Sequence, residues 1–120
     1  MILVVDDETE IAEELADLLS CHFTDVHFAT SASEGLKIAL EVEPELVITD
    51  MRMPEMDGAE LVRRIDTAVD KPTSFIIVSG HLEAEDDLAH LHDIDYKLMS
   101  KPIDVDGFID VVSQYSVAKL

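Results

Sequence analysis

The sequence predicts an α/β domain in which a parallel sheet is covered by helices on both faces. Short, nearly continuous apolar runs alternate with segments whose apolar residues recur at helical spacing. Buried parallel strands are apolar throughout and need helical crossovers, so this alternation favours a doubly wound sheet. The chain has 120 residues, the length of one ordinary domain. We therefore expect five strands and five helices in strict alternation within residues 1–120.

The five expected strands are apolar runs of five or six residues. They lie at residues 2–6, 24–29, 46–50, 74–79 and 95–100. In the second run, His27 separates Val26 from Phe28. Alternation of this kind is typical of a half-covered strand, so we expect the second strand near an edge of the sheet.

Five helices are expected between and after these strands. The residues expected to face the sheet are Ile11, Leu15, Leu18 and Leu19 in the first helix, Ala32, Leu36, Ala39 and Leu40 in the second, Leu61, Val62 and Ile65 in a short third, and Val105, Phe108, Ile109 and Val112 in the fifth. Ser31 and Glu34 have capping-box spacing at the start of the second helix, which should end before Pro44. Asp104 is a good N-cap residue for the fifth helix. The fourth, over residues 82–92, has only a thin apolar face.

Charge and composition exclude several classes of function. The chain has eight Lys and Arg residues and 27 Asp and Glu residues, which gives a formal charge of −19. We therefore expect no direct binding of nucleic acid or of an anionic membrane. No apolar stretch approaches the roughly 20 residues of a membrane span, and the start lacks the basic residues of a signal peptide. The single cysteine, Cys21, excludes an internal disulfide, and we expect it to be buried or half-buried. We expect a cytoplasmic protein.

Polar residues stand where four of the apolar runs end. Asp6 and Asp7 follow the first run, Asp50 closes the third, Ser79 the fourth and Lys101 the fifth. Parallel strands bring their carboxyl ends to one edge of a sheet, where open α/β sheets bind ligands. Carboxylates beside an ammonium and a hydroxyl suit a hard cation and a phosphoryl group.

The same residues carry a resemblance to a known family. At Val4–Glu8, at Asp50–Gly58 (DMRMPEMDG), at Ser79–Gly80 and at Lys101–Pro102, the chain resembles a response regulator receiver domain of the CheY-like superfamily, used in two-component signalling. The resemblance covers nearly all 120 residues. It implies a flavodoxin-like (βα)5 domain with strand order 2-1-3-4-5.

The resemblance also implies a role for each residue of the site. Asp50 would be the phosphoacceptor, receiving the group from a histidine kinase or a phosphotransfer protein. Lys101 and Ser79 would bind the phosphoryl oxygens. Mg²⁺, with Mn²⁺ as an alternative ion, would be held by Asp6, Asp7, Asp50 and the backbone carbonyl of Arg52. Without the ion, mutual repulsion should raise the pKa of at least one carboxylate.

Five further residues are expected to modulate the site. They are Arg52, His81, Gly80, Pro102 and Leu98. The arginine and the histidine would control the access of water, the glycine leaves room beside the hydroxyl, and the proline would fix a turn, in the family through a cis bond. The family usually carries an aromatic residue where this chain has the leucine, which puts the usual conformational switch in question.

Three functional hypotheses follow. The first is a receiver domain that catalyses only its own phosphorylation and dephosphorylation and is otherwise not an enzyme. It would switch the binding of a downstream protein through the face of the fourth helix, fifth strand and fifth helix. A phosphorylation-dependent homodimer is compatible with it, and no output domain is expected in the chain. The second is a magnesium-dependent phosphohydrolase with an aspartate nucleophile, disfavoured because Arg52 stands where such enzymes want a second Asp. The third is a pseudo-receiver without phosphorylation, disfavoured by the complete residue set. The kinase, stimulus, output, oligomeric state and full extent of the protein stay open.

Overall fold

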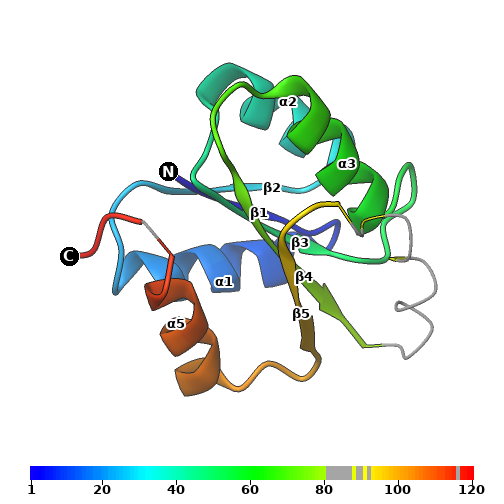
Figure 1. The fold of residues 1–120 in the computed structure, drawn as a ribbon. Coiled ribbons are helices and arrows are strands. Elements are labelled where there is room, and N and C mark those ends of the chain that lie inside the picture. The colour runs from blue at the N-terminus through cyan, green and yellow to red at the C-terminus, as the bar shows by residue number, and fades with distance from the viewer. Residues whose placement is uncertain (81–87, 89–90, 92, 116) are drawn as a thin grey trace.

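Five strands form one parallel sheet in the order β2-β1-β3-β4-β5. The computed structural model describes residues 1–80, 88, 91, 93–115 and 117–120. The strands are β1 (Ile2–Val5), β2 (Val26–Ala29), β3 (Leu46–Asp50), β4 (Ser74–Ser79) and β5 (Tyr96–Ser100). The helices are α1 (Thr9–Ser20), α2 (Ala32–Val42), α3 (Gly58–Ala68) and α5 (Val105–Ser113). In Figure 1, α2 and α3 cover one face of the sheet and α1 and α5 the other, so the predicted fold and strand order are confirmed.

The element boundaries agree with the sequence pattern to within two residues for the strands. The predicted edge position of β2 is confirmed, with Phe28 38% exposed. The third helix has three turns rather than being short. The expected fourth helix falls mostly outside the described residues, although Leu88 and Leu91 are described and buried. Within the described ranges, no helix combines the length and apolar character that a bilayer span needs.

Side-chain hydrogen bonds fix the start of α2, and a left-handed residue ends the helix. The hydroxyl of Ser31 accepts from the N–H of Glu34 at 3.1 Å, as the capping-box spacing predicts. The carboxylate of Glu34 accepts in return from the N–H of Thr30, one residue earlier than in the standard box. At the other end, Glu43 has a left-handed backbone with φ of 53°, which turns the chain immediately before Pro44.

Aspartate caps start the two helices that follow β3 and β5. Asp57 accepts from the N–H of Glu60 at 2.8 Å, and Asp104 accepts from the N–H of Gly107 at 3.2 Å. Each cap supplies a partner for a backbone donor that the first turn leaves free. The caps therefore define where the loops at the carboxyl edge of the sheet end.

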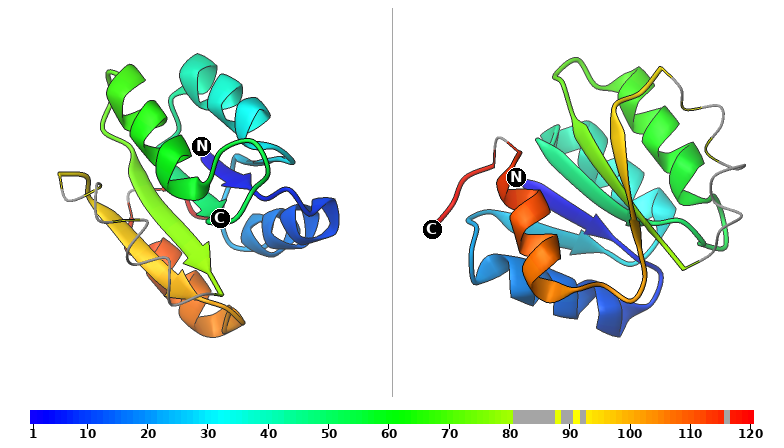
Figure 2. Two further views of the ribbon diagram at one scale, coloured as in Figure 1. Left: turned by 90° about the vertical axis from the view of Figure 1, so that its right-hand side faces the viewer. Right: turned by 60° about the horizontal axis from the view of Figure 1, so that its bottom comes forward.

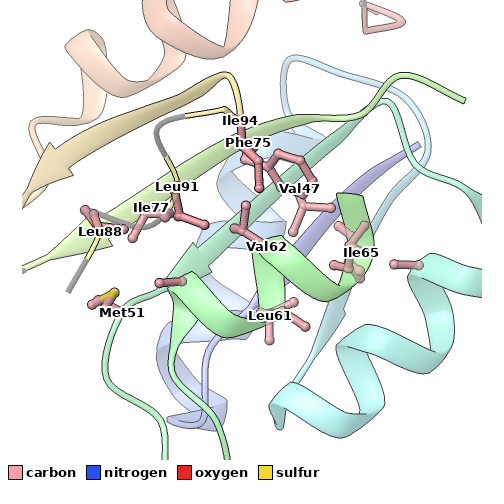
Figure 3. Close-up of a cluster of buried hydrophobic side chains, with 14 of the residues drawn as sticks. Val47, Met51, Leu61, Val62, Ile65, Phe75, Ile77, Leu88, Leu91 and Ile94 are labelled. Atoms are coloured by element: carbon pink, nitrogen blue, oxygen red, sulfur yellow. The ribbon is translucent and has the colours of Figure 1, made fainter. Parts of the chain in front are cut away.

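Two apolar layers hold the helices on the sheet. The layer under α2 and α3 includes Val47, Met51, Leu61, Val62, Ile65, Phe75 and Ile77, together with Leu88, Leu91 and Ile94 (Figure 3). The layer under α1 and α5 includes Ile2, Val4, Leu19, Phe23, Ile48, Ile76, Phe108 and Val112. Because strand residues point alternately to the two faces, each buried strand contributes to both layers.

The face that α1 buries differs from the predicted one. Its fully buried residues are Ala12, Ala16 and Leu19. Ile11, Leu15 and Leu18, which the spacing places in the core, are only half-buried. Small alanines allow the helix to lie close to the sheet, and this contact turns the larger side chains toward the flank of α1.

Three other predictions of burial are wrong. Leu40 is 45% exposed, Val105 is 50% exposed, and Cys21 is exposed at the end of α1. The reason is clearest for α2, where a Cβ on Gly35 would lie 2.7 Å from a methyl group of Val5. The helix meets the sheet along this glycine, so a leucine further round the helix reaches solvent.

Candidate functional site

The strand registers bring the predicted polar residues to one edge of the sheet. Val5 of β1 is level with Thr49 of β3, so Asp6 and Asp50, the next residue of each chain segment, are neighbours. Asp50 is level with Val78 of β4. The same edge receives the ends of β4 and β5, and Figure 2 (left) looks at the molecule from this side.

Three carboxylates lie together at this edge. One oxygen from each of Asp6, Asp7 and Asp50 lies within 4.8 Å of the other two. Asp6 is 3% exposed and Asp50 is 9% exposed, whereas Asp7 lies nearer the surface. Lys101 completes the cluster, because its Nζ lies 2.9 Å from Oδ1 of Asp50.

Most of the other predicted residues surround the same carboxylates. A hollow of about 230 Å³ is lined by Asp7, Glu8, Asp50, Arg52, Ser79, Gly80 and Lys101. Ser79 is 5% exposed, and its carbonyl accepts from the N–H of Lys101 at 2.9 Å. A Cβ added to Gly80 would meet the Lys101 side chain only at ordinary contact distance. The expected cis bond between Lys101 and Pro102 is confirmed.

Among the predicted residues that the structure describes, Asp6, Pro102 and Leu98 are not part of this lining. His81 lies outside the described residues. Leu98 is level with Ile77 of β4, is half-buried, and packs against the layer under α2 and α3. Tyr96, two residues earlier, packs against the same layer. Leu98 therefore belongs to the apolar layer behind the site and does not line it.

Burial and crowding affect the charge of Asp6. Its burial raises the pKa of this carboxyl above the ordinary value of 3.8, and the neighbouring Asp50 and Asp7 raise it further. The N–H of Glu8, which donates to Oδ1 of Asp6 at 2.9 Å, and the ammonium of Lys101 act in the opposite direction. The direction of the pKa shift at Asp6 is the predicted one, but burial contributes more to it than the repulsion between carboxylates on which the prediction was based.

The same cluster holds Lys101 in its charged form. Partial burial opposes the ammonium, but the hydrogen bond to Asp50 and the charges of Asp50, Asp6 and Glu8 outweigh it and raise the pKa of Lys101 above 10.5. The lysine is therefore a permanent point charge at physiological pH.

The donor set fits a hard divalent cation such as Mg²⁺. All three clustered groups are carboxylates, and oxygen ligands are what Mg²⁺ prefers. Two oxygens on opposite sides of a bound Mg²⁺ are separated by about 4.2 Å. The carboxylate oxygens of Asp6, Asp7 and Asp50 already lie within 4.8 Å of one another, so small side-chain movements would suffice.

Three contacts of the site are not predictable from the residue pattern. The backbone N–H of Glu8 orients Asp6, and the hydroxyl of Thr49 donates to the backbone carbonyl of Asp50 at 2.9 Å. Gly58 lies against that same carbonyl, where a Cβ would come to 2.5 Å. A Gly at the end of the D-x-x-M-P-x-M-D-G stretch is the one signal in the sequence for such an approach.

We predict that the metal-free protein becomes more stable when Asp6 loses its charge. Because the pKa of Asp6 is higher in the folded protein than in the unfolded chain, the contribution of this carboxyl to the free energy of unfolding is fully present below pH 3.8. That contribution is lost as the pH rises through the folded pKa. Asp6→Asn keeps an oxygen acceptor for Glu8, and should raise the free energy of unfolding near pH 7 by on the order of 1 kcal/mol in EDTA.

Urea unfolding of both proteins across acid to neutral pH checks this, and the difference should shrink toward acid pH. Excess Mg²⁺ should favour the wild type, because only the intact triad binds the ion fully. If the Asp6→Asn protein had a lower free energy of unfolding than wild type in EDTA at pH 7, the predicted stabilisation would be wrong.

Comparisons with known proteins agree with the fold and the site. The profile of the response regulator receiver domain matches residues 2–113. An uncharacterized response regulatory protein of Staphylococcus epidermidis is 33% identical over 121 residues, covering 94% of this chain and 46% of that protein. An uncharacterized 14.6 kDa protein of Leptolyngbya boryana is 32% identical over 118 residues, covering 98% of this chain and 90% of that protein. The chain thus spans about half the length of the staphylococcal relative.

Solved structures show the same architecture. A response regulator receiver domain protein from Clostridium thermocellum superposes with a TM-score of 0.84 at 29% identity, covering 94% of this chain and 90% of that one. A receiver domain protein from Methanospirillum hungatei gives a TM-score of 0.82 at 26% identity, with the same coverage. With the profile match over residues 2–113 and the acidic triad at the carboxyl edge, the chain belongs to the response regulator receiver domain family of two-component signalling.

Proposed function

We propose that residues 1–120 act as one receiver domain that accepts a phosphoryl group on Asp50 from a histidine kinase or a phosphotransfer protein. The observation that carries this proposal is the position of Asp50, whose carboxylate is bonded to Lys101 and lies beside Asp6 and Asp7. A nucleophile at this place is accessible through the hollow, yet is surrounded by groups that can neutralise a phosphoryl group.

The transfer exchanges one bond to phosphorus for another. A carboxylate oxygen of Asp50 attacks phosphorus, the P–N bond of the phosphohistidine breaks, and the imidazole leaves with the electron pair. Lys101 changes partner from the carboxylate to a phosphoryl oxygen, and the Ser79 hydroxyl donates to another. Bound at the triad and the carbonyl of Arg52, Mg²⁺ would neutralise negative charge on the carboxylates and the incoming group. Phosphoryl transfer needs mainly this positioning and charge neutralisation.

Residues at the rim of the hollow should control how long the acyl phosphate on Asp50 lasts, because they control the access of water to it. Arg52 is exposed and lines the hollow. His81, to which the sequence assigns the same role, lies outside the described residues. A smaller residue at position 52 should admit water more freely, so Arg52→Ala is expected to lose the label faster. The decay of phosphorylated protein measures this, with Arg64→Ala on the outer side of α3 as control. Equal decay of wild type and Arg52→Ala would refute the role.

We assign the output to the face that the sequence predicts for the fourth helix together with β5 and α5. Of the residues expected in that helix, 82–92, only Leu88 and Leu91 are described. Phosphorylation would change how this face binds a downstream protein, or a second copy in a phosphorylation-dependent dimer. The position of β5 at the end of the sheet supports this, since a terminal strand is covered on one side only. With Leu98 in the apolar layer, movement of the face would have to proceed without the usual aromatic ring.

The test is labelling with acetyl phosphate and Mg²⁺. Wild type is expected to gain the mass of one phosphoryl group, and Asp50→Asn should gain none, because the amide is a poor nucleophile. Asp66→Asn, an exposed change on α3 with the same chemistry, should label like wild type. Rapid turnover of many phosphoesters would favour the phosphohydrolase, and a wild-type mass that never rises would favour the pseudo-receiver.

A further inference from the structure

A buried hydroxyl beside the phosphoacceptor has no part in the transfer described above. Across the described ranges, the buried polar and charged residues are Asp6, Thr49, Asp50 and Ser79. Three of them belong to the site, and Thr49 is the fourth, with none of its surface exposed. Valine has nearly the same branched shape and would fill this position of a buried strand without a polar group. Packing alone therefore does not account for the hydroxyl of Thr49.

The side chain of Thr49 lies on the side of the sheet that α2 and α3 cover. It is level with Val5 of β1 and Ile77 of β4, and both belong to the apolar layer there. Figure 3 shows Ile77 in that layer together with Val47, two residues before Thr49 on the same side of β3. By the same alternation, Asp50 points away from this layer. Thr49 is therefore behind the phosphoacceptor and does not face the incoming group.

The peptide group that follows Asp50 is held at both of its polar atoms. Its carbonyl oxygen accepts from the hydroxyl of Thr49 at 2.9 Å. Its N–H, which belongs to Met51, donates to the carbonyl of Val78 at 3.0 Å. A peptide group is planar and nearly rigid, so bonds on its two edges together fix its rotation about the chain. The hydroxyl supplies the bond on the carbonyl edge, where Gly58 also approaches.

The orientation of this peptide group affects two parts of the site. The Cα before it carries the carboxylate of Asp50, and the chain after it leads to the carbonyl of Arg52, which is expected at the metal ion. Rotation of the peptide group would move these two oxygen ligands relative to each other. Loss of a hydrogen bond that orients a ligand typically costs roughly 10- to 100-fold in metal affinity or activity.

We propose that the hydroxyl of Thr49 is a positioning group for phosphoryl transfer, because it holds the carbonyl of Asp50 and so fixes the peptide group between Asp50 and Met51. The inference rests on the proposed function, and adds to it a residue that acts on the reaction only through the phosphoacceptor. Since the hydroxyl touches neither the donor nor the phosphoryl group, its loss should slow the transfer and weaken the binding of Mg²⁺, and should leave the binding of the donor unchanged.

Labelling with acetyl phosphate and Mg²⁺ tests this role. Thr49→Val removes the hydroxyl and keeps the branched shape, so the maximal labelling rate should fall roughly tenfold with no change in the half-saturating concentration of acetyl phosphate. Thr49→Ser brings the hydroxyl back and should rescue most of that rate. Thr73→Val is the control, because the Thr73 hydroxyl also donates to a backbone carbonyl, that of Pro44 at 3.1 Å, but stands before β4 at the amino edge of the sheet. It should label like wild type.

NMR spectra of the metal-free protein give a second readout that needs no donor. Loss of the hydrogen bond in Thr49→Val should shift the ¹³C resonance of the Asp50 carbonyl and the ¹⁵N resonance of Met51, and serine should reverse both shifts. In wild type, the hydroxyl proton of Thr49 should be visible and exchange slowly with water, because it is buried and bonded. Calorimetric titration should show roughly tenfold weaker binding of Mg²⁺ by Thr49→Val.

Several results would overturn the positioning role. Thr49→Val could label at the wild-type rate, or leave the Asp50 and Met51 resonances where they are. An equal loss of rate in Thr73→Val would assign the effect to general stability, and an equal loss in Thr49→Ser would assign it to the methyl group. If Thr49→Val does not fold, rapid exchange of the Thr49 hydroxyl proton in wild type would overturn the role instead.

The positioning role and the proposed function can fail separately. If wild type and Thr49→Val take label equally fast, the positioning role is wrong and Asp50 is still the phosphoacceptor. If wild type never takes label, the proposed function is wrong. The metal-free spectra and the Mg²⁺ affinity of Thr49→Val then still decide whether the hydroxyl positions Asp50.

Discussion

Replacing Lys101 by Met is expected to slow the labelling of Asp50 by acetyl phosphate roughly 100-fold, the scale seen when one charge-stabilising donor is removed from an active site. The ammonium lies 2.9 Å from Oδ1 of Asp50, where it can pass to a phosphoryl oxygen as the new bond forms. Without the ammonium, one positive charge fewer offsets the repulsion between the three carboxylates and the incoming phosphoryl group. The initial rate of mass gain at saturating Mg²⁺ is the measurement.

The same substitution should have the opposite effect on metal affinity. Lys101 repels a divalent cation and occupies an oxygen of Asp50, so Lys101→Met should bind Mg²⁺ more tightly in calorimetric titration. Slower transfer with tighter Mg²⁺ binding separates loss of the lysine from general damage to the site. Lys97→Met, which removes an exposed charge from the same strand, should change neither quantity. Labelling of Lys101→Met within a factor of about three of wild type would contradict the role of the ammonium.

The location of the site could be predicted because it depends on strand ends alone. Polar residues that follow apolar runs mark the carboxyl ends of buried strands, and a parallel sheet necessarily brings those ends to one edge. Asp6, Asp50, Ser79 and Lys101 lie together for this reason, whatever the packing of the side chains behind them. The fold follows from the same periodicity.

The buried face of α1 could not be predicted, because helical spacing does not show which part of a wide apolar face meets the sheet. In α1 the apolar residues extend from Ala12 and Ala16 round to Leu15, and the pattern alone favours the larger side chains as core. The alanines in fact pack closest to the sheet. Size favours Leu15 as a core residue, although this leucine is only half-buried.

Contacts made by backbone atoms could not be predicted from the sequence either. The N–H of Glu8 and the carbonyl of Asp50 gain their roles from the path of the chain, which residue types do not specify. Gly58 is the clearest case, because no glycine in the described residues has a positive φ. Its requirement is one of space, and space is known only when α3 is placed against the end of β3.

Gly58→Ala is therefore expected to be the most damaging single-methyl substitution at the site. The new Cβ would lie 2.5 Å from the carbonyl oxygen of Asp50 and 3.1 Å from Cα of Met51. Both neighbours are backbone atoms, so no side chain can rotate away, and the N–H of Gly58 is held by the carbonyl of Met51 at 2.8 Å. We expect a loss of about 2 kcal/mol in the free energy of unfolding, measured in urea, despite the better helix propensity of alanine.

Gly80→Ala is the matched control for that loss. A Cβ there would be 3.8 Å from Lys101, an ordinary contact, so its stability should stay within about 0.5 kcal/mol of wild type. Relief of the clash at Gly58 must move either the start of α3 or the end of β3, and the second movement carries Asp50 with it. Because a shift of about 1 Å in a reacting group can cost 100-fold in rate, the folded fraction of Gly58→Ala should also label more than tenfold more slowly. Wild-type stability together with wild-type labelling would show that α3 can be displaced without moving Asp50, and that the glycine does not position the phosphoacceptor.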